Sequence, residues 1–328
     1  MARILVTNWI DGDTLARLAA HGEVDAPTTR DVPSPDDVLR RAADADAMIA
    51  FMPDCVDARF LAAAPALKIV ACALKGYDNF DVEACTEAGV WVSIVPDLLT
   101  APTAELALGL AIGLARHVSA GDAHVRSGRF AGWRPTLYGV GLDGSTVAVL
   151  GLGALGKAVA RRLAGFGCRI LGFDADPQTA AENVERYALD AALAQADYIF
   201  AALPLGTGAR HILDARRITL CKPGALLVNV GRGSTVVESA VADALERGHL
   251  GGYAADVFEM EDWALADRPR AIEPRLLAHP HTLFTPHLGS AVATVRRAIA
   301  LAAAENVLDA LAGRRPRDAV NEPKRREA

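Results

Sequence analysis

The sequence predicts an α/β protein of two domains, each a parallel sheet with flanking helices, and one of them doubly wound. Three observations support this prediction. Apolar, β-branched runs alternate with helical segments along most of the chain. The run at residues 146–150 breaks into a turn with three glycines and then becomes helical. The 328 residues, 52% of them hydrophobic, are enough to fill two cores.

The turn reads Gly151-Leu-Gly-Ala-Leu-Gly156. Without side chains at Gly151 and Gly153, the backbone can turn sharply and a pyrophosphate can approach it closely. Gly156 lets the following helix pack on the strand. Ala154 and Leu155 begin that helix, and its N-terminal N–H groups point at the phosphates. This order of strand, glycines and helix is typical of a Rossmann fold that binds a dinucleotide.

The next strand, residues 169–173, ends in Asp174, 18 residues after Gly156. An acid at this strand end accepts hydrogen bonds from both adenosine ribose hydroxyls of NAD, and the usual spacing is about 20 residues. Ala175 offers no cation for a 2′-phosphate, and Asp176 would add to its repulsion. The pattern therefore predicts NAD as the cofactor, in preference to NADP.

The order of the elements divides the chain into three parts. Residues 1–98 form the first part of a substrate-binding, catalytic domain, residues 99–289 form the NAD-binding domain, and residues 290–328 return to the first domain. In the middle part we expect strands at 146–150, 169–173, 198–203, 225–230, 253–257 and 282–285, and helices near 154–164, 180–186, 214–220 and 238–247. A basic tail at 314–328 follows the return helix, and we expect it to be solvated. Active-site residues would then line the cleft between the domains.

Composition excludes several classes of partner. The net charge of −6, without a basic stripe along the folded part, argues against nucleic acid and acidic membranes. The five cysteines are scattered and odd in number, which is typical of a reduced, cytoplasmic protein. No secretory signal and no membrane-spanning run is recognisable. One helix, residues 103–117, is apolar on every face, and it predicts a homodimer because a partner would cover it.

Three polar side chains follow predicted strands of the NAD-binding domain at the edge where a nicotinamide would lie: Arg232, Glu261 and His287. An arginine gives an anionic substrate a bidentate fork. A histidine can take a proton near neutral pH, and a carboxylate bonded to it fixes its tautomer. A loop histidine without a task is the alternative for His287 alone. His279, His281 and His287 lack the spacing of a zinc site, so no metal is expected.

Four motifs carry a resemblance to a known family. They are Gly151-Leu-Gly-Ala-Leu-Gly156, Asn229-Val-Gly-Arg-Gly233, Asp256-Val-Phe-Glu-Met-Glu261 and Pro286-His-Leu-Gly-Ser290. Over essentially its whole length the chain resembles the D-2-hydroxyacid dehydrogenases, whose catalytic order is Arg, Glu, His. Within that family it is most similar to the phosphite (phosphonate) dehydrogenase branch, through Cys72-Ala-Leu-Lys-Gly76 and Glu259-Met-Glu-Asp-Trp263 among other segments.

The resemblance implies that phosphite is oxidised to phosphate, with hydride transfer to NAD. His287 would be the base for water, Glu261 would orient it, and Arg232 with Lys75 would bind the oxyanion. Phosphite is largely a dianion at neutral pH, so a second cation has a clear purpose. Two alternatives remain open: a D-2-hydroxyacid dehydrogenase of the glyoxylate or hydroxypyruvate reductase type, and an NAD-sensing binding protein of the same fold.

The predicted sites comprise the following residues. Substrate contacts are expected from Met52, Lys75, Gly76, Arg232, His287 and Ser290. Arg296, Trp133 and Tyr138 match further positions of the resemblance, the last two reaching from a neighbouring subunit. For Met52, Ser290 and these three residues, a role in packing is the alternative. Cofactor contacts are expected from Thr103, Gly151, Gly153, Ala154, Leu155, Gly156, Asp174, Ala175, Leu203, Pro204, Thr207, Val230, Arg232, Asp256 and His287.

Overall fold

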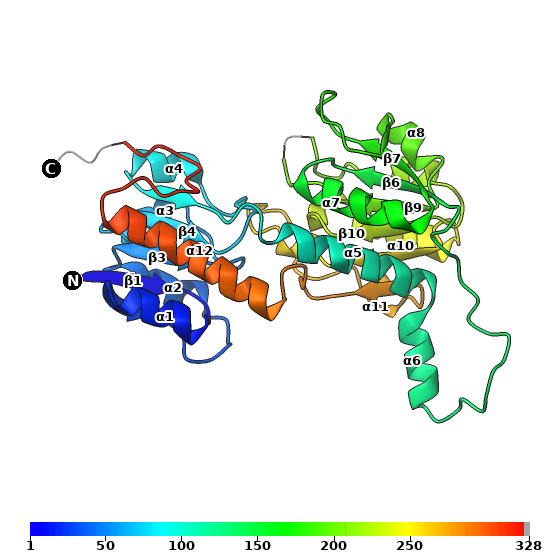
Figure 1. The fold of residues 1–328 in the computed structure, drawn as a ribbon, viewed down its shortest axis with the longest axis horizontal. Coiled ribbons are helices and arrows are strands. Elements are labelled where there is room, and N and C mark those ends of the chain that lie inside the picture. The colour runs from blue at the N-terminus through cyan, green and yellow to red at the C-terminus, as the bar shows by residue number, and fades with distance from the viewer. Residues whose placement is uncertain (207, 325–328) are drawn as a thin grey trace. The chain divides into compact units, whose positions relative to one another are not determined.

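The computed structural model describes residues 1–206 and 208–324 and divides the chain into two compact units. Unit 1 comprises Met1–Leu99, Trp263–Ala266 and the residues from Ala291 onward, and unit 2 comprises Thr100–Asp262 and Asp267–Ser290. Each unit is a parallel sheet flanked by helices, so the predicted fold class is confirmed (Figure 1). The sequence pattern places residues 263–266 in the cofactor domain. They follow a short 3-10 helix outside any strand, so no periodic pattern ties them to a unit.

Unit 1 contains a five-stranded parallel sheet in the order β2-β1-β3-β4-β5. Its strands are β1 (Ala2–Val6), β2 (Gly22–Asp25), β3 (Ala47–Ala50), β4 (Ile69–Cys72) and β5 (Trp91–Ser93). Its helices are α1 (Gly12–Ala19), α2 (Pro35–Ala42), α3 (Ala58–Ala63), α4 (Val82–Glu87) and α12 (Ala293–Leu311). Helix α12 buries Ile299 and Val307 against the sheet, beside Ile4 and Ile69. The C-terminal helix thereby completes a core that the first 99 residues begin.

Unit 2 contains a seven-stranded parallel sheet in the order β12-β11-β10-β9-β6-β7-β8. Its strands are β6 (Thr146–Leu150), β7 (Arg169–Phe173), β8 (Glu185–Arg186), β9 (Tyr198–Ala201), β10 (Leu226–Asn229), β11 (Gly252–Ala255) and β12 (Thr282–Phe284). Its helices are α5 (Thr100–Ala115), α6 (Val118–Arg126), α7 (Ala154–Leu163), α8 (Leu189–Leu193), α9 (Ala215–Leu220), α10 (Glu238–Glu246) and α11 (Pro274–Ala278), with 3-10 turns η1 (Ala164–Phe166), η2 (Gly233–Thr235) and η3 (Glu259–Glu261). The strand order reverses at β6, where a doubly wound sheet opens a ligand crevice.

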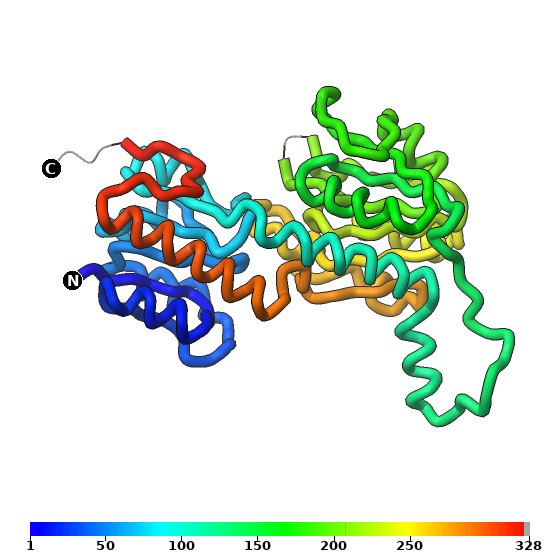
Figure 2. The backbone as a smooth tube through the Cα atoms, viewed as in Figure 1, coloured from blue at the N-terminus to red at the C-terminus, as the bar shows by residue number. Residues whose placement is uncertain are grey.

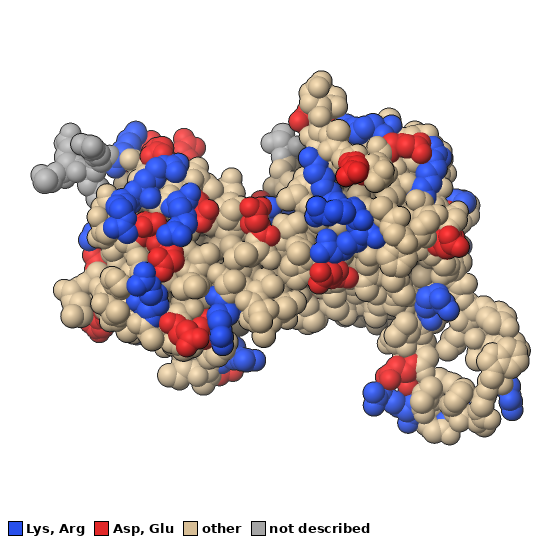
Figure 3. Space-filling model, viewed as in Figure 1, with Lys and Arg blue, Asp and Glu red and all other residues tan. Residues whose placement is uncertain are grey.

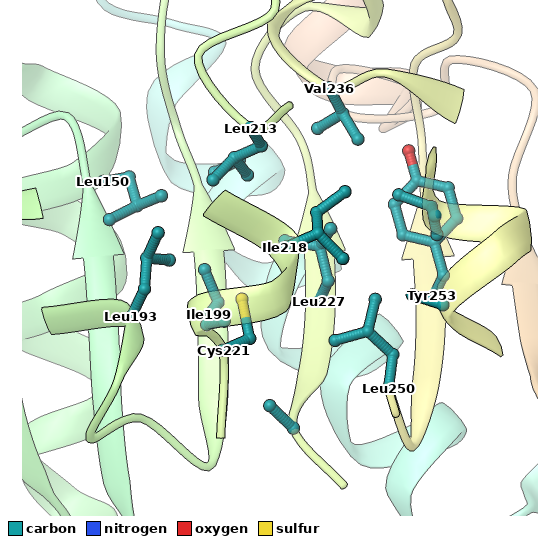
Figure 4. Close-up of a cluster of buried hydrophobic side chains, with 14 of the residues drawn as sticks. Leu150, Leu193, Ile199, Leu213, Ile218, Cys221, Leu227, Val236, Leu250 and Tyr253 are labelled. Atoms are coloured by element: carbon teal, nitrogen blue, oxygen red, sulfur yellow. The ribbon is translucent and has the colours of Figure 1, made fainter. Parts of the chain in front are cut away.

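The unit 2 sheet is buried on both faces because its strands alternate apolar side chains between two cores. Val147 and Val149 point to one cluster, and Ala148 and Leu150 point to the other. Figure 4 shows the second cluster, in which side chains from neighbouring strands pack under α8 and α9. A sheet covered on both faces is rigid, so the loops at its carboxyl edge start from fixed positions.

The predicted helix at residues 180–186 is wrong. Asn183 has a φ of 58°, in the left-handed region, which interrupts a helix. Glu185 and Arg186 instead form the edge strand β8, paired parallel to β7. Arg169 on β7 binds both carboxylate oxygens of Glu185, at 2.6 and 2.9 Å. Pairing with a strand distant in sequence therefore outweighs the local helix propensity of the alanine-rich segment.

The prediction of a solvated C-terminal tail is wrong for residues 318–321. The Val320 N–H donates to the Val92 carbonyl at 2.9 Å, and Asn321 Oδ1 accepts from the Val92 N–H at 2.8 Å. This segment therefore runs along β5, and beyond it the tail lies beside α4 (Figure 2). Residues 325–328 lie outside the described part of the chain.

Two further properties concern the described residues as a whole. No helix among them is both long and apolar enough to cross a bilayer. All five cysteines are free thiols, and three of them, Cys72, Cys85 and Cys221, are buried. Burial raises the pKa of the Cys72 thiol well above its usual value. These cysteines act as small apolar core residues.

Candidate active site

Neighbouring strands of the unit 2 sheet present the three predicted catalytic side chains at one edge. Arg232 follows β10, Glu261 ends η3 after β11, and His287 follows β12. Because β10, β11 and β12 are adjacent and parallel, their carboxyl ends meet at the same edge. The order Arg, Glu, His along the chain is therefore also their order across the sheet.

The structure brings Glu261 and His287 into direct contact. His287 Nδ1 lies 2.6 Å from Glu261 Oε2, and the other oxygen of Glu261 accepts the Phe258 N–H at 3.0 Å. A carboxylate on Nδ1 favours the tautomer with the proton on that nitrogen and leaves Nε2 free to accept another proton. His287 is partly buried. The pair therefore has the arrangement that an oriented general base requires, with Glu261 holding the imidazole.

The backbone of His287 is held in an unfavourable conformation. Its φ is 56°, in the left-handed region that is sparsely populated by residues with side chains. The His287 N–H donates to the carbonyl oxygens of Asp256 and Thr285, at 2.9 and 3.0 Å. The buried Asp256 carboxylate accepts from the Thr285 hydroxyl at 2.6 Å and from the N–H groups of Leu288 and Gly289 at 2.6 and 2.8 Å. These bonds fix the loop that carries His287.

Burial raises the pKa of Asp256 above its usual range, although the Thr285 hydroxyl and two backbone N–H groups stabilise its charge. The sequence motif predicts that Asp256 contacts the cofactor. The structure shows it bonded to the 285–289 loop. Asp256 therefore at least holds the loop that positions His287.

A second network joins the loop that carries Arg232 to the turn that carries Glu261. The buried Glu238 and Glu259 each accept the other's backbone N–H, both at 2.9 Å. Asp262 Oδ2 accepts the Ser234 N–H at 2.6 Å. A Cβ at Gly233 would lie 1.9 Å from the Phe258 carbonyl carbon, so only glycine permits this approach. The loop that carries Arg232 and the turn that carries Glu261 are thus joined by hydrogen bonds.

Sequence reasoning missed one histidine in this network. His211 Nε2 lies 2.9 Å from Glu259 Oε2, and His211 also has a positive φ of 52°. The two glutamates at the ends of η3 therefore each pair with a histidine, Glu259 with His211 and Glu261 with His287. Glu259, in the motif Asp256-Val-Phe-Glu259, was the available sequence signal for this pair. It was not sufficient, because its partner His211 lies 48 residues away along the chain.

The glycine-rich turn has the geometry that phosphate binding requires. Gly151 has a φ of 89°, and a Cβ at Gly156 would lie 1.8 Å from the Gly151 carbonyl oxygen. Apart from Gly153 itself and its chain neighbours, no atom lies within 4 Å of the Cβ position at Gly153, so that position is open. Helix α7 starts at Ala154 without a side-chain cap. Its first N–H groups, with that of Leu155, are therefore placed to bind a dinucleotide pyrophosphate.

Asp174, the predicted ribose ligand, ends β7 beside this turn. Its Oδ2 accepts the Leu152 N–H at 2.7 Å and its Oδ1 accepts the Asp176 N–H at 3.0 Å. Ala175 lies between the two aspartates. The acid therefore links the glycine-rich turn to the segment that would face the adenosine ribose. The glycine-rich turn and Asp174 therefore fit a nicotinamide dinucleotide. Such a cofactor, when bound, would supply the hydride acceptor.

The other predicted cofactor residues of unit 2 lie along the same edge. Leu203 packs beside the positions of Gly151 and Gly231, and Thr103 of α5 lies beside Gly289. Val230 is buried at the end of β10, and Pro204 is exposed. Ser290, which is predicted to contact the substrate, is half-buried in unit 2. Thr207 lies outside the described residues.

Unit 1 holds the remaining predicted substrate residues. Lys75 and Gly76 follow β4 and are half-buried, and Met52 follows β3 with its carbonyl bonded to Asn79. Lys75 forms no ion pair with any residue in the described ranges. Arg296 Nη1 lies 3.5 Å from the Ala73 carbonyl, and burial lowers the pKa of its guanidinium. Lys75 after β4 and Arg296 of α12 thus place two cations near the carboxyl end of β4. In the described part of the chain, no group of histidine, cysteine and carboxylate side chains could hold a metal ion.

Comparison with known proteins gives consistent matches. The model of the NAD-binding domain of D-isomer specific 2-hydroxyacid dehydrogenases matches residues 108–289. A glyoxylate reductase of Pyrococcus furiosus is 34% identical over 97% of this chain and 95% of its own length. A crystal structure from Thermus thermophilus is 35% identical, with a TM-score of 0.89, over 97% of this chain and 100% of that one. An NADPH-dependent glyoxylate/hydroxypyruvate reductase of Sinorhizobium meliloti is 28% identical, with a TM-score of 0.82, over 98% of each chain.

The glycine-rich turn allows a paired test of folding and binding. Gly156→Ala should destabilise unit 2 by on the order of 1–3 kcal/mol or more, because its Cβ would collide with the Gly151 carbonyl. Gly153→Ala should fold normally but bind NAD at least about tenfold more weakly, because its Cβ would enter the open ligand side. Thermal unfolding and calorimetric titration measure the two effects. Gly165→Ala, at another open position, serves as the control, and equal behaviour of all three variants would contradict this account.

Glu261→Gln should keep the shape of the pair but remove the charge that orients His287. We expect kcat for the best substrate to fall about 10²-fold or more, with little change in NAD binding, because general-base catalysis contributes this much. Steady-state kinetics over a range of pH measure the effect. The exposed Glu246→Gln is the matched control. A Glu261→Gln enzyme with wild-type kcat would show that the pair is structural only.

Proposed function

This chain belongs to the D-isomer specific 2-hydroxyacid dehydrogenase family, and we propose that it is an NAD-dependent dehydrogenase whose substrate is phosphite. The choice of phosphite as substrate rests on Lys75. It is a half-buried lysine without an ion-pair partner among the described residues, at the carboxyl end of β4. A compact dianion needs more positive charge than the carboxylate of a hydroxyacid, and Lys75 would add to the charge of Arg232.

In the proposed reaction, HPO₃²⁻ + NAD⁺ + H₂O gives HPO₄²⁻ + NADH + H⁺. NAD, when bound, supplies the acceptor for the hydrogen that leaves phosphorus with its electron pair. The oxygen of water forms the new bond to phosphorus. Nε2 of His287 takes the proton of that water, while Glu261 stabilises the imidazolium. By this proposal Arg232 and Lys75 would each bind oxygens of the anion and so stabilise charge in the transition state.

The second candidate is a D-2-hydroxyacid dehydrogenase of the glyoxylate or hydroxypyruvate reductase type. The names of the relatives favour it, since those that are 34% identical over nearly the whole chain are glyoxylate reductases. The same residues suit this chemistry: Arg232 would bind the substrate carboxylate, and His287 would exchange a proton with the substrate oxygen. A binding protein that only senses NAD has less support, because the Glu261–His287 pair is built for proton transfer.

For the cofactor we propose NAD over NADP. Asp174 at the end of β7 would bond the ribose hydroxyls and repel a 2′-phosphate. The structure from Sinorhizobium meliloti is that of an NADPH-dependent enzyme, so the family name alone does not decide between the two cofactors.

We also propose that the enzyme is a homodimer. Helix α6 and the loop 127–144 extend from unit 2 as an arm (Figure 1), and most of the arm surface visible in Figure 3 is uncharged. The exposed apolar side chains of this arm are Val118, Val125, Phe130, Trp133, Leu137, Tyr138 and Val140. Helix α5 is packed on one side against α7, β10 and β11, but its Ile112 is exposed. A second copy of the chain would bury these groups, and Trp133 and Tyr138 would then reach the partner.

The substrate test compares phosphite, D-lactate and D-glycerate with NAD, and glyoxylate with NADH, by absorbance at the NADH band. We expect the highest kcat/KM with phosphite. Lys75→Ala should lower kcat/KM for phosphite by about 30- to 150-fold, as expected for loss of a charge-assisted contact worth about 2–3 kcal/mol.

The matched control is Lys68→Ala at the opposite end of β4, where the lysine is exposed and paired with Asp46. It should leave phosphite oxidation unchanged. Glyoxylate reduction faster than phosphite oxidation would replace the first candidate by the second. Phosphite oxidation that survives in Lys75→Ala would remove Lys75 from the substrate site.

The dimer test is sedimentation equilibrium at micromolar concentration. The wild-type chain should sediment as a dimer, and Trp133→Ser combined with Tyr138→Ser should weaken association at least about tenfold, since each ring would lose a large apolar contact. Trp9→Ser in unit 1, which is 42% exposed, is the control and should leave the dimer intact. A wild-type monomer at this concentration would refute the proposal.

A further inference from the structure

Two aspartates, Asp174 and Asp176, form the turn that follows β7, and each accepts hydrogen bonds from groups further along the chain. Asp174 Oδ1 accepts the Asp176 N–H at 3.0 Å. Asp176 in turn accepts the Gln178 N–H at 2.9 Å and the Thr179 hydroxyl at 3.0 Å. This turn would lie beside the adenosine ribose of a bound dinucleotide. The charges around it therefore decide whether a 2′-phosphate can be accommodated.

Arg186 reaches this turn from the neighbouring strand. Strand β8 pairs parallel to β7, with Arg186 opposite Gly172. Arg186 Nη2 donates to the carbonyl oxygens of Asp174 and Asp176, at 3.1 and 3.3 Å. The local sequence predicts no cation close to Asp174, because Arg186 is 12 residues away along the chain. The structure corrects that expectation, since a paired strand brings the guanidinium to the turn.

Arg186 retains most of its capacity to bind an anion. It is exposed, and within the described ranges it forms no ion pair, so its hydrogen-bond partners are two neutral carbonyls. The Gln178 N–H, the Thr179 hydroxyl and the Arg186 charge all lower the pKa of Asp176. Arg169, the other arginine of the β7–β8 pair, is already committed to Glu185 and Tyr187.

We propose that Arg186 is a second determinant of dinucleotide specificity, and that it binds a 2′-phosphate only when the carboxylate of Asp174 is removed. In the wild type, the carboxylate of Asp174 excludes a 2′-phosphate in spite of Arg186. If Asp174 is replaced by a neutral residue, the guanidinium becomes the phosphate ligand, because its planar fork binds two phosphate oxygens. One substitution at Asp174 is then sufficient to admit NADP, with no arginine added at Ala175. This inference rests on the proposed dinucleotide site.

Equilibrium binding of adenosine fragments tests this without any turnover. The two probes are adenosine 2′,5′-bisphosphate and adenosine 5′-monophosphate, and the ratio of their Kd values isolates the 2′-phosphate. Asp174→Ser should shift this ratio toward the bisphosphate by about 10- to 100-fold. The double variant Asp174→Ser with Arg186→Gln should lose most of that shift, and Asp174→Ser with Arg186→Lys should retain part of it, because the charge remains.

The matched control is Asp174→Ser with Arg161→Gln, which removes an exposed arginine of α7 and should keep the full shift. A shift that survives Arg186→Gln, or an Asp174→Ser variant without any shift, would overturn the proposal. Thermal unfolding of Arg186→Gln alone should show a folded protein that binds adenosine 5′-monophosphate like the wild type, and loss of that binding would make Arg186 a structural residue instead. Failure of the wild type to bind NAD or the monophosphate would overturn the proposed function as well, so the two failures are distinguishable.

Discussion

The position of His287 depends on one buried carboxylate, that of Asp256. A residue in the left-handed region opposes its own backbone preference, and the surrounding structure has to offset that cost. Asp256, directly after β11, stabilises this conformation, because it binds the 285–289 loop through its carboxylate and its carbonyl oxygen. The imidazole is thus placed by an element other than the strand that precedes it. Removing this carboxylate would release the loop and leave the N–H groups of Leu288 and Gly289 and the Thr285 hydroxyl without this acceptor.

Buried carboxylates that accept backbone N–H groups also occur after the neighbouring strands. Glu238 and Glu259 bind each other's amides, and Asp262 binds the amide of Ser234. Buried carboxylates normally need cations, whereas Glu238 and Asp262 accept backbone N–H groups and Glu259 accepts an N–H and contacts His211. Burial raises the pKa of Glu238, and the backbone N–H groups that it accepts oppose this rise. Hydrogen bonds to amides are directional, so they specify the separation of the loops more tightly than apolar packing would. The active-site edge of unit 2 is therefore preorganised before any ligand binds.

The sequence was sufficient for features whose signal is local. The alternation of apolar runs predicted the two parallel sheets, and the three glycines predicted the turn before α7. The motif order predicted that Glu261 and His287 belong to the same edge. Features created by strand pairing were not predictable in this way. Asn183 ends a segment rich in helix-forming residues, and His211 meets Glu259 only because their loops leave neighbouring parts of the sheet. Val320 and Asn321 likewise gain their partners only from the folded β5 edge.

The division of unit 1 between the two ends of the chain bears on how the protein folds during its synthesis. Strands β1 to β5 are translated before α12, which together with α1 covers one face of their sheet, through Ile299 and Val307. At about 5–20 residues per second, the intervening residues 100–290 take on the order of 10–40 s to translate. Unit 2, which is nearly contiguous, can complete its core during that interval. Until α12 is translated, the nascent chain therefore carries a sheet whose apolar face is only partly covered, and we expect chaperones that shield such surfaces to bind this segment until α12 emerges.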